Sequence, residues 1–411
     1  MKLLSGIRVI ELGLWVAGPA AAGILADWGA EVIKIEMPSG DPMRRLFGAL
    51  SGSREERCPP FDLYNRGKRS IALDINTVEG VDLVRRLISS ADVFLTNMRP
   101  QFLQRVGLDS ATLLAARPDL IYASLTAYGL EGPDRDAPGY DMAAFSGRSG
   151  IAERATPQGA APPILPGGIG DNVSALSLVA GIAGALFHRE RTGQGQLVST
   201  SLLRNGVYGI GMDVSTRLGL GRIAPAQSRL KPQNPLMNVY QAQDDRWFWL
   251  IGAESERHWP GILAATGLED LAVDTRFATP RDRRRHGTEL VAIFDQTFAS
   301  KPRDDWGRIF VEHDVWWAPV QSVDELVCDP QAIASGAFVS VPAVDGDAYA
   351  EVFNSVATPI DFSATPAAPA GPPPAIGADT EALLDSLGVD RGVRERLRQA
   401  GVLAARSGAH Q

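Results

Sequence analysis

Apolar and polar residues follow two different periods in the first half of the chain, and this pattern predicts strands separated by helices. The segments Arg8–Leu12 and Glu31–Glu36 are short and rich in branched apolar residues, which is typical of strands. Between them, Gly18-Pro19 opens a helix that we expect to extend through Asp27, because proline is tolerated at the first helical position. Two strands joined by a helix form a βαβ unit, which requires parallel strands.

The same alternation continues towards residue 126. Strands are predicted at Ser70–Ile75, Val93–Asn97 and Leu120–Thr126, with helical spacing of apolar residues between them. Strands that alternate with helices are typical of a doubly wound sheet. The sequence therefore predicts an α/β fold with a Rossmann-like parallel sheet.

A long helix is predicted after Asp171. Its apolar residues recur at helical spacing and end near Arg189–Arg191, with Gly193 beyond: Val173, Leu176, Val179, Ile182 and Leu186. The run Ala175–Phe187 is too short to cross a bilayer, so we expect a buried helix. Residues 195–203 predict a further strand.

The second half of the chain has a different texture. Short strands are predicted at Asn238–Gln241 and Arg246–Gly252 and are followed by helices, so residues 225–325 are interpreted as a smaller α+β domain. Residues 364–374 contain five prolines, which favours an extended connector to a last helix from Thr380.

Composition narrows the possible partners and location. The 411 residues have a formal net charge of −8, which argues against a general nucleic-acid-binding surface. The basic run at residues 281–286 is interpreted as a solvated face. Cys58 and Cys328 are too few for a disulfide framework or a Cys-x-x-Cys metal site, and no signal peptide is recognised. We expect a cytoplasmic protein with no metal, no nucleic-acid partner and no membrane partner.

The turn after the first predicted strand resembles a dinucleotide site only superficially. Residues 12–18 lack the G-x-G-x-x-G pattern that lets a pyrophosphate approach the backbone, although Glu36 ends the second strand as such sites require. Bound NAD or FAD is therefore not expected.

A series of motifs resembles the family III CoA-transferases. The N-terminal motifs are V-A-G-P at 16–19, L-A-D-W-G-A-E-V-I-K-I-E at 25–36, G-D-P-M-R at 40–44, and N-R-G-K-R-S-I-A-L-D at 65–74. The later ones are D-V-F-L-T-N at 92–97, G-P at 132–133, P-G-Y-D at 138–141, G-D at 170–171 and T-G-Q-G-Q at 192–196. They occur in the family's order and spacing, and a weaker likeness extends to residues 379–381.

The resemblance implies an architecture that periodicity alone would not indicate. Each chain would be a ring interlocked with its partner in a homodimer. A large CoA-binding domain, residues 1–205, would be completed by residues 335–405. Residues 206–224 and 326–334 would then link it to the small domain.

Asp171 matches the family's nucleophilic aspartate. An aspartate ahead of a helix is more often an N-cap, but a helix N-terminus also favours the anionic carboxylate that attacks a thioester. The resemblance implies transfer of coenzyme A between carboxylic acids through an aspartyl anhydride and an aspartyl-CoA thioester, with no tightly bound cofactor. Backbone N–H groups of Gly167, Gly168 and Gly170 are candidate donors to the developing oxyanion.

The resemblance also implies a set of CoA contacts, of which Arg105 is the expected phosphate partner. The matching positions are Val16, Ala17, Met37, Leu73, Asp74, Asn97, Met98, Arg99, Arg105, Tyr140 and Asp141.

Two departures from relatives bear on the substrate. Formyl-CoA transferases have glutamine at the position of Val16 and a four-glycine loop where this chain has residues 231–238, so oxalate is not expected and a bulkier or more apolar acyl group is favoured. The aromatic runs Trp247-Phe248-Trp249 and Trp316-Trp317 either line an acyl pocket or, as is more usual, pack the small domain.

Two other functions remain open. In α-methylacyl-CoA racemase a histidine precedes the aspartate that Asp141 matches, whereas this chain has Tyr140, a poor base at neutral pH. The other histidines lie outside that motif, at positions 188, 258, 286, 313 and 410. A non-catalytic acyl-CoA-binding protein is the third possibility.

Overall fold

The computed structural model describes residues 1–46, 57–157, 159–226, 228–344 and 349–404. These residues belong to two compact units. The larger unit contains Met1–Ala152, Ile164–Arg222 and Gly336–Gln411. The smaller unit contains Glu153–Pro163 and Ile223–Ser335. Each unit has its own hydrophobic core.

A six-stranded parallel sheet forms the centre of the larger unit. Its strands are β1 (Arg8–Leu12), β2 (Glu31–Glu36), β3 (Arg69–Ala72), β4 (Val93–Thr96), β5 (Ile121–Thr126) and β6 (Gln196–Ser201). Their order is β3-β2-β1-β4-β5-β6, so the direction of winding reverses between β1 and β4. The predicted parallel sheet is confirmed, while the third and last strands are shorter than expected.

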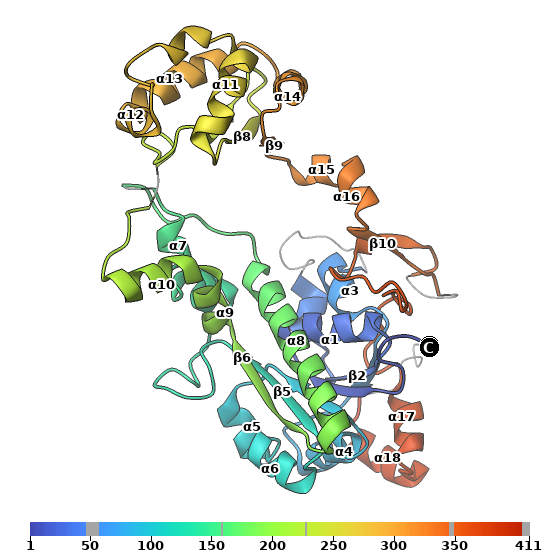
Figure 1. The fold of residues 1–411 in the computed structure, drawn as a ribbon. Coiled ribbons are helices and arrows are strands. Elements are labelled where there is room, and N and C mark those ends of the chain that lie inside the picture. The colour runs from blue at the N-terminus through green and yellow to red at the C-terminus, as the bar shows by residue number, and fades with distance from the viewer. Residues whose placement is uncertain (47–56, 158, 227, 345–348, 405–411) are drawn as a thin grey trace. The chain divides into compact units, whose positions relative to one another are not determined.

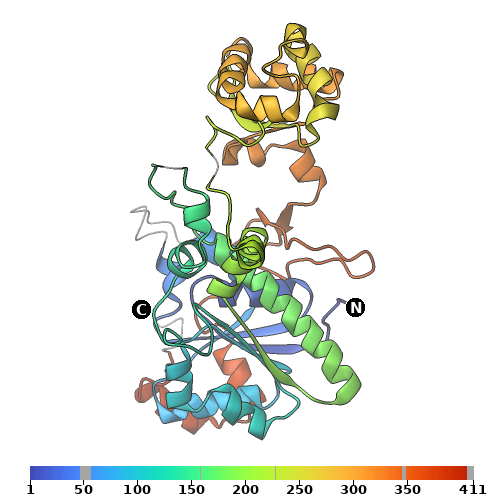
Figure 2. The same ribbon diagram turned by 60° about the vertical axis from the view of Figure 1, so that its left-hand side comes forward.

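Helices cover both faces of this sheet, as Figures 1 and 2 show. One face packs against α1 (Ala17–Asp27) and α8 (Ile169–Thr192). The other face packs against a second set: α4 (Val78–Ile88), α5 (Pro100–Val106), α6 (Ser110–Ala116), α17 (Thr380–Ser386) and α18 (Arg391–Gln399). Neighbouring strand residues serve opposite layers, since Val9 packs with α1 and α8 while Ile10 packs with the second set.

Helix α8 is only half buried, which corrects the expectation of a buried helix. Ala175, Leu178 and Ile182 are fully buried, whereas Val173 is 42% and Phe187 64% exposed. Among the described residues it is the one helix long and apolar enough to cross a membrane by length and composition. The core helix of a soluble protein passes the same test, so this is weak evidence for a membrane span.

The smaller unit combines an antiparallel sheet with several helices (Figure 1). The sheet has the order β7-β8-β9, with β7 at Met237–Gln241, β8 at Trp247–Ile251 and β9 at Trp317–Pro319. The helices are α11 (Ser255–Thr266), η3 (Glu269–Ala272), α12 (Pro280–Arg285), α13 (Gly287–Phe298), α14 (Arg303–Glu312), α15 (Val323–Leu326) and α16 (Pro330–Ala334). An aromatic cluster fills the core: Tyr240, Phe248, Phe294, Phe298, Trp306 and Phe310.

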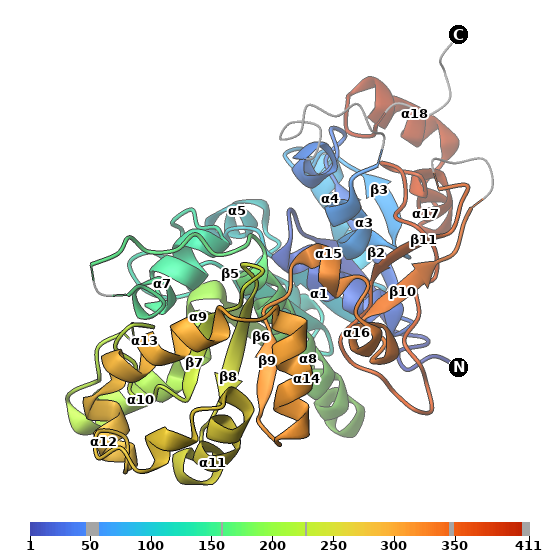
Figure 3. The ribbon, with the colours of Figure 1, turned by 90° about the horizontal axis from the view of Figure 1, so that it is seen from above.

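Shorter elements complete the chain. They are η1 (Pro42–Arg45), α3 (Pro59–Asn65), η2 (Met142–Gly147), α7 (Ile151–Arg154), α9 (Leu202–Gly209), α10 (Gly211–Leu220), β10 (Phe338–Val341) and β11 (Phe353–Val356). Strands β10 and β11 form an antiparallel pair, visible in Figure 3. Helices α9 and α10 occupy much of the segment that was expected to be a linker at 206–224.

The proline-rich segment 364–374 has no helix or strand, as predicted, but it is fastened to the larger unit. Ala368 N–H donates to the carbonyl of Asp27, and the Arg44 guanidinium donates to the carbonyl of Pro374 at 2.9 Å. Farther on, the carboxylate of Asp379 accepts the backbone N–H of Ser70 at 2.9 Å. The C-terminal segment therefore continues the packing of edge strand β3.

A buried ionic network lies beneath the loop that follows β1. The Glu11 carboxylate contacts Lys34 Nζ at 3.0 Å and Lys68 Nζ at 2.7 Å, and Lys34 Nζ contacts Asp41 Oδ2 at 2.9 Å. All four side chains are inaccessible to solvent. Burial lowers the pKa of Lys34, but the carboxylates of Glu11, Asp41 and Glu36 outweigh it and hold the pKa above its usual range. Lys34 also donates to the Gly13 carbonyl at 3.0 Å, which ties the network to the loop.

We expect Glu11→Gln to lower the free energy of unfolding by about 3 kcal/mol or more, because it leaves buried lysine charge without its partner. Glu31→Gln is the matched control, since Glu31 pairs with Arg8 and Arg69 at the surface and is 34% exposed. The control should cost about 1 kcal/mol or less. Urea denaturation of both variants measures the difference. Equal losses would contradict a special role for the buried network.

Candidate active site

The candidate site lies where the sheet reverses its winding. The loop 13–16 follows β1, and Asn97 follows β4, the neighbouring strand across the reversal. The side-chain amide of Asn97 makes two hydrogen bonds to the backbone of Leu14 in this loop. Its oxygen accepts the N–H of Leu14 at 2.9 Å, and its NH₂ group donates to the carbonyl of Leu14 at 2.8 Å. In open α/β sheets, ligands bind at this carboxyl-end crevice.

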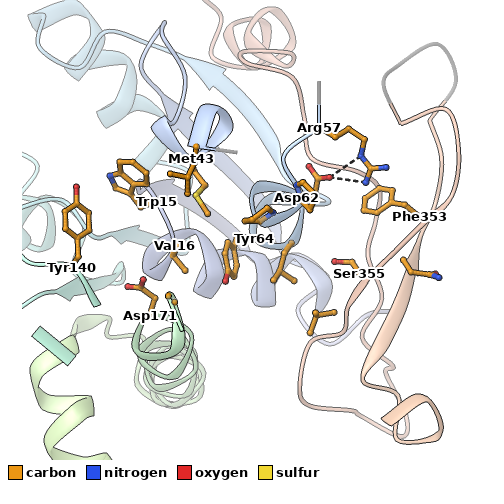
Figure 4. A pocket seen from close by; sticks show the side chains of 18 residues that line it. Trp15, Val16, Met43, Arg57, Asp62, Tyr64, Tyr140, Asp171, Phe353 and Ser355 are labelled. Carbon is orange, nitrogen blue, oxygen red and sulfur yellow. Dashed lines mark hydrogen bonds and ion pairs between the residues drawn. The ribbon is translucent and has the colours of Figure 1, made fainter. Parts of the chain in front are cut away.

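Asp171 enters the site from the first turn of α8. The helix begins at Ile169, and its N-cap is Gly168 at φ +87°. Asp171 therefore lies inside the first turn, and the expectation that it is the N-cap is wrong. The side chain lines two separate cavities. In Figure 4 it faces Val16, with Tyr140 on one side and Tyr64 on the other. The carboxylate is therefore accessible from cavities and is not enclosed in packed interior.

A second carboxylate beside Asp171 changes its ionisation. Burial and the nearby Asp141 raise the pKa of Asp171 to about 7. The helix N-terminus was expected to favour the anion, but burial and like charge prevail. Burial also raises the pKa of Asp141, although this carboxylate accepts the N–H of Gly170 at 3.2 Å. That hydrogen bond occupies the Gly170 N–H, which was one of the predicted oxyanion donors. Asp141 also accepts the backbone N–H of Gly168. Gly167 lines the larger cavity and remains a candidate.

The two cavities meet at Asp171 and share four lining residues: Trp15, Val16, Tyr140 and Asp171. The smaller cavity, about 280 Å³, opens towards the ends of β4 and β5 and has two arginines among its lining residues, Arg99 and Arg135. The larger cavity, about 990 Å³, extends between α3 and β11. A bound molecule with two chemically different halves would therefore have the bond that joins them next to the Asp171 carboxylate.

Six of the predicted CoA contacts line the smaller cavity together: Val16, Ala17, Asn97, Met98, Arg99 and Tyr140. The other five are not among its lining residues. Leu73 is fully buried and paired with Leu403, while Asp74 and Met37 are partly buried. Arg105 is exposed at the end of α5, with its guanidinium over Phe102. The role of all eleven residues in binding stays a prediction.

The described histidines, His188, His258, His286 and His313, are not among the lining residues of either cavity, and His410 lies outside the described part of the chain. His258 is buried against Trp316, with ring centroids 4.8 Å apart.

Phe248 and Trp317 pack in the core of the smaller unit, whereas Trp249 and Trp316 are each 44% exposed. Packing therefore accounts for two of these aromatic residues.

Sequence reasoning missed three residues that the fold brings to the site. Trp15 lies in the turn after β1 and carries no motif of its own, and Arg135 lies two residues after the G-P motif at 132–133. Tyr64 closes the larger cavity from α3, and burial raises the pKa of its phenol while Asn172 hydrogen-bonds it. No local pattern marked these residues, because their proximity arises from strand order and helix packing.

Comparison with known proteins gives consistent matches along the chain. A family model described as CoA-transferase family III matches residues 4–380. The (R)-2-hydroxy-4-methylpentanoate CoA-transferase of Clostridioides difficile is 32% identical over 389 residues, covering 94% of this chain and 96% of the relative. The cinnamoyl-CoA:phenyllactate CoA-transferase of Clostridium sporogenes is 35% identical over 340 residues, covering 81% and 82%.

The fold is matched by solved structures as well. A CaiB/BaiF family protein from Brucella suis superposes with a TM-score of 0.81 at 29% identity, covering 94% of this chain and 99% of that chain. The six-stranded α/β architecture is thus shared with proteins of that family.

We expect Gly170→Ala to destabilise the start of α8. A Cβ at residue 170 would lie 2.5 Å from Asp141 Oδ1 and closer still to the Phe145 ring, so the acidic pair would have to move apart. Gly184→Ala is the matched control, because it lies in the same helix with nothing within 4 Å of its Cβ. That control should be neutral or gain up to about 1 kcal/mol from helix propensity. Thermal unfolding of both variants measures this, and a stable Gly170→Ala protein would contradict the close packing.

Proposed function

The chain belongs to CoA-transferase family III, and from that membership we propose that it transfers coenzyme A between carboxylic acids with Asp171 as the covalent nucleophile. The observation that supports this most directly is the position of Asp171 at the junction of two cavities. A thioester has the same two-ended character, with a long pantetheine arm on one side and an acyl group on the other.

In the proposed reaction, an oxygen of Asp171 attacks the thioester carbonyl and forms an acyl-aspartyl anhydride as the C–S bond breaks. The released CoA thiolate attacks the aspartyl carbonyl, which breaks the anhydride, expels the first acid and leaves an aspartyl-CoA thioester. A second carboxylate then attacks this thioester, and the same steps run in reverse. Each intermediate remains activated, so the sequence of steps needs no ATP and no redox group.

The smaller cavity is the proposed route of coenzyme A to Asp171. Arg99 lines it and is suited to the phosphate groups, since arginine pairs well with phosphate oxygens. Arg135 also lines it but already contacts Asp136 Oδ2 at 3.1 Å. We therefore expect Arg99 in place of Arg105 as the phosphate partner, because Arg105 does not line the cavity. The acyl group would then extend into the larger cavity.

The racemase alternative is less well supported. Two-base racemisation requires a base facing Asp171 across the α-carbon, and no histidine lines either cavity among the described residues. The relatives at 31–35% identity that are named as CoA-transferases also favour transfer.

We also propose that the protein is a homodimer, with the interlocked arrangement that the family resemblance implies and the large and small domains at the expected boundaries. Exposed apolar side chains on α9 and α10 support an interface there. Tyr208 and Met212 are each 88% exposed, and Leu218 is 81% exposed. Large apolar patches of this kind usually mark a surface that another chain covers.

The free Cys58 and Cys328 support a cytoplasmic location.

Hydroxylamine trapping tests the nucleophile. Incubation with an acyl-CoA followed by hydroxylamine should convert Asp171 to a hydroxamate, which peptide mass spectrometry detects as a 15 Da increase in mass, about that of NH. Asp171→Ala should abolish transfer while CoA still binds. Deuterium entering the α-carbon without acyl exchange would contradict transfer and favour the racemase.

The proximity of Asp171 and Asp141 predicts that the reaction rate depends on pH. Only ionised Asp171 attacks, and its pKa is raised to about 7, so kcat/KM should rise with pH and level off above that value. Asp141→Asn removes the neighbouring negative charge while keeping an acceptor for the Gly170 N–H, and should shift the profile to lower pH. A profile that is flat from pH 5 to pH 9 would show that Asp171 does not control the rate. An unshifted variant would show that Asp141 does not contribute to the raised pKa of Asp171.

A further inference from the structure

The larger cavity is apolar around the end that faces Asp171. Its walls there come from three elements: Val16 and Trp15 on the loop after β1, Met43 on η1, and Leu63 and Tyr64 on α3. Phe353 and Val356 of β11 line it as well. Such a surface favours an acyl group with a substantial apolar body, because each buried CH₂ contributes about 0.8 kcal/mol.

The other end of the cavity is polar but already neutralised. Arg57 contacts Asp62 Oδ2 at 3.1 Å, and its guanidinium lies 4.1 Å from the centre of the Phe353 ring (Figure 4). The phenol of Tyr349 donates to Asp62 Oδ1 at 2.6 Å. Arg57 is the one basic side chain among the described lining residues, and Asp62 compensates its charge. A second substrate carboxylate would therefore bring uncompensated negative charge into a site that also holds Asp171.

Trp15 lies at the boundary of the two cavities. It is one of the four residues that line both of them, and its ring meets the ring of Tyr140 edge-on with centroids 6.1 Å apart. Its backbone is left-handed at φ +65°, which is uncommon for a bulky residue and persists only when neighbours hold it. The Trp15 N–H donates to Asp41 Oδ1 at 3.2 Å, and Asp41 is itself fixed by buried Lys34. The backbone of Trp15 is therefore held in place by buried groups.

We propose that the larger cavity selects monocarboxylic acids with a bulky apolar body, branched or aromatic, and that Trp15 is the specificity-determining residue that confines this body to the cavity. The inference rests on the proposed function and goes beyond it by naming the acid. Trp15 does not take part in the chemistry. It keeps the acyl body from entering the space of the pantetheine arm.

A panel of acceptor acids tests the substrate class with the unmodified protein. With acetyl-CoA as donor, 3-phenylpropanoate and 4-methylpentanoate should show kcat/KM values at least about tenfold above those of propionate and glutarate, since a single methylene in an apolar pocket is already worth that factor. Preference for glutarate would overturn the proposal, because it would mean that Arg57 receives a second carboxylate. Equal rates for all four acids would overturn it as well.

Two substitutions test the role of Trp15. Trp15→Ala should lower kcat/KM for 3-phenylpropanoate at least about tenfold more than it lowers kcat/KM for propionate. Trp15→Phe should restore most of the preference. An equal loss for both acids, or a loss that phenylalanine does not rescue, would assign Trp15 a purely structural role and overturn this part.

Trapping at Asp171 distinguishes a wrong substrate class from a wrong nucleophile. A hydroxamate at Asp171 together with the wrong acid preference would overturn this inference alone. Failure to form the hydroxamate with any donor would overturn the proposed function and the inference with it.

Discussion

The site depends on a buried pairing of charges beneath the loop after β1. Lys34 contacts Glu11 and Asp41 with no access to solvent, and Asp41 in turn holds the N–H of Trp15. Buried ions are stable only when they are paired and hydrogen-bonded, so these groups have little freedom to rearrange. The network thereby fixes a loop whose backbone would not otherwise adopt a left-handed conformation at a tryptophan.

Asp171 illustrates how two opposing electrostatic effects combine. Its place in the first turn of α8 favours the anion, whereas burial and the neighbouring Asp141 favour the protonated form and raise the pKa to about 7. A carboxylate with a raised pKa is a stronger nucleophile once ionised, yet a substantial fraction is still ionised near neutral pH. The close approach of the pair requires Gly170, since any side chain there would meet Asp141 and Phe145.

The crevice at the reversal of the sheet contains two cavities with different linings. One has arginines among its lining residues and lies near the ends of β4 and β5, and the other is mostly apolar and lies beside α3 and β11. Trp15 and Tyr140 stand between them. A thioester that spans this boundary would present its carbonyl to Asp171 while its two ends occupy chemically distinct surroundings.

The sequence alone determined the parallel α/β sheet and the positions of β1, β2 and α1, because periodicity is encoded in neighbouring residues. The resemblance to a family marked Asp171 as the candidate nucleophile. The sequence did not determine that Asp171 lies inside the first turn of α8, that Asp141 occupies the Gly170 N–H, or that α8 is half exposed. Those features, like the ionic network of Glu11 and the cavity lining of Trp15, Tyr64 and Phe353, join residues that are distant in sequence. Only tertiary packing decided them, since burial and charge proximity exist only once strand order has brought these side chains together.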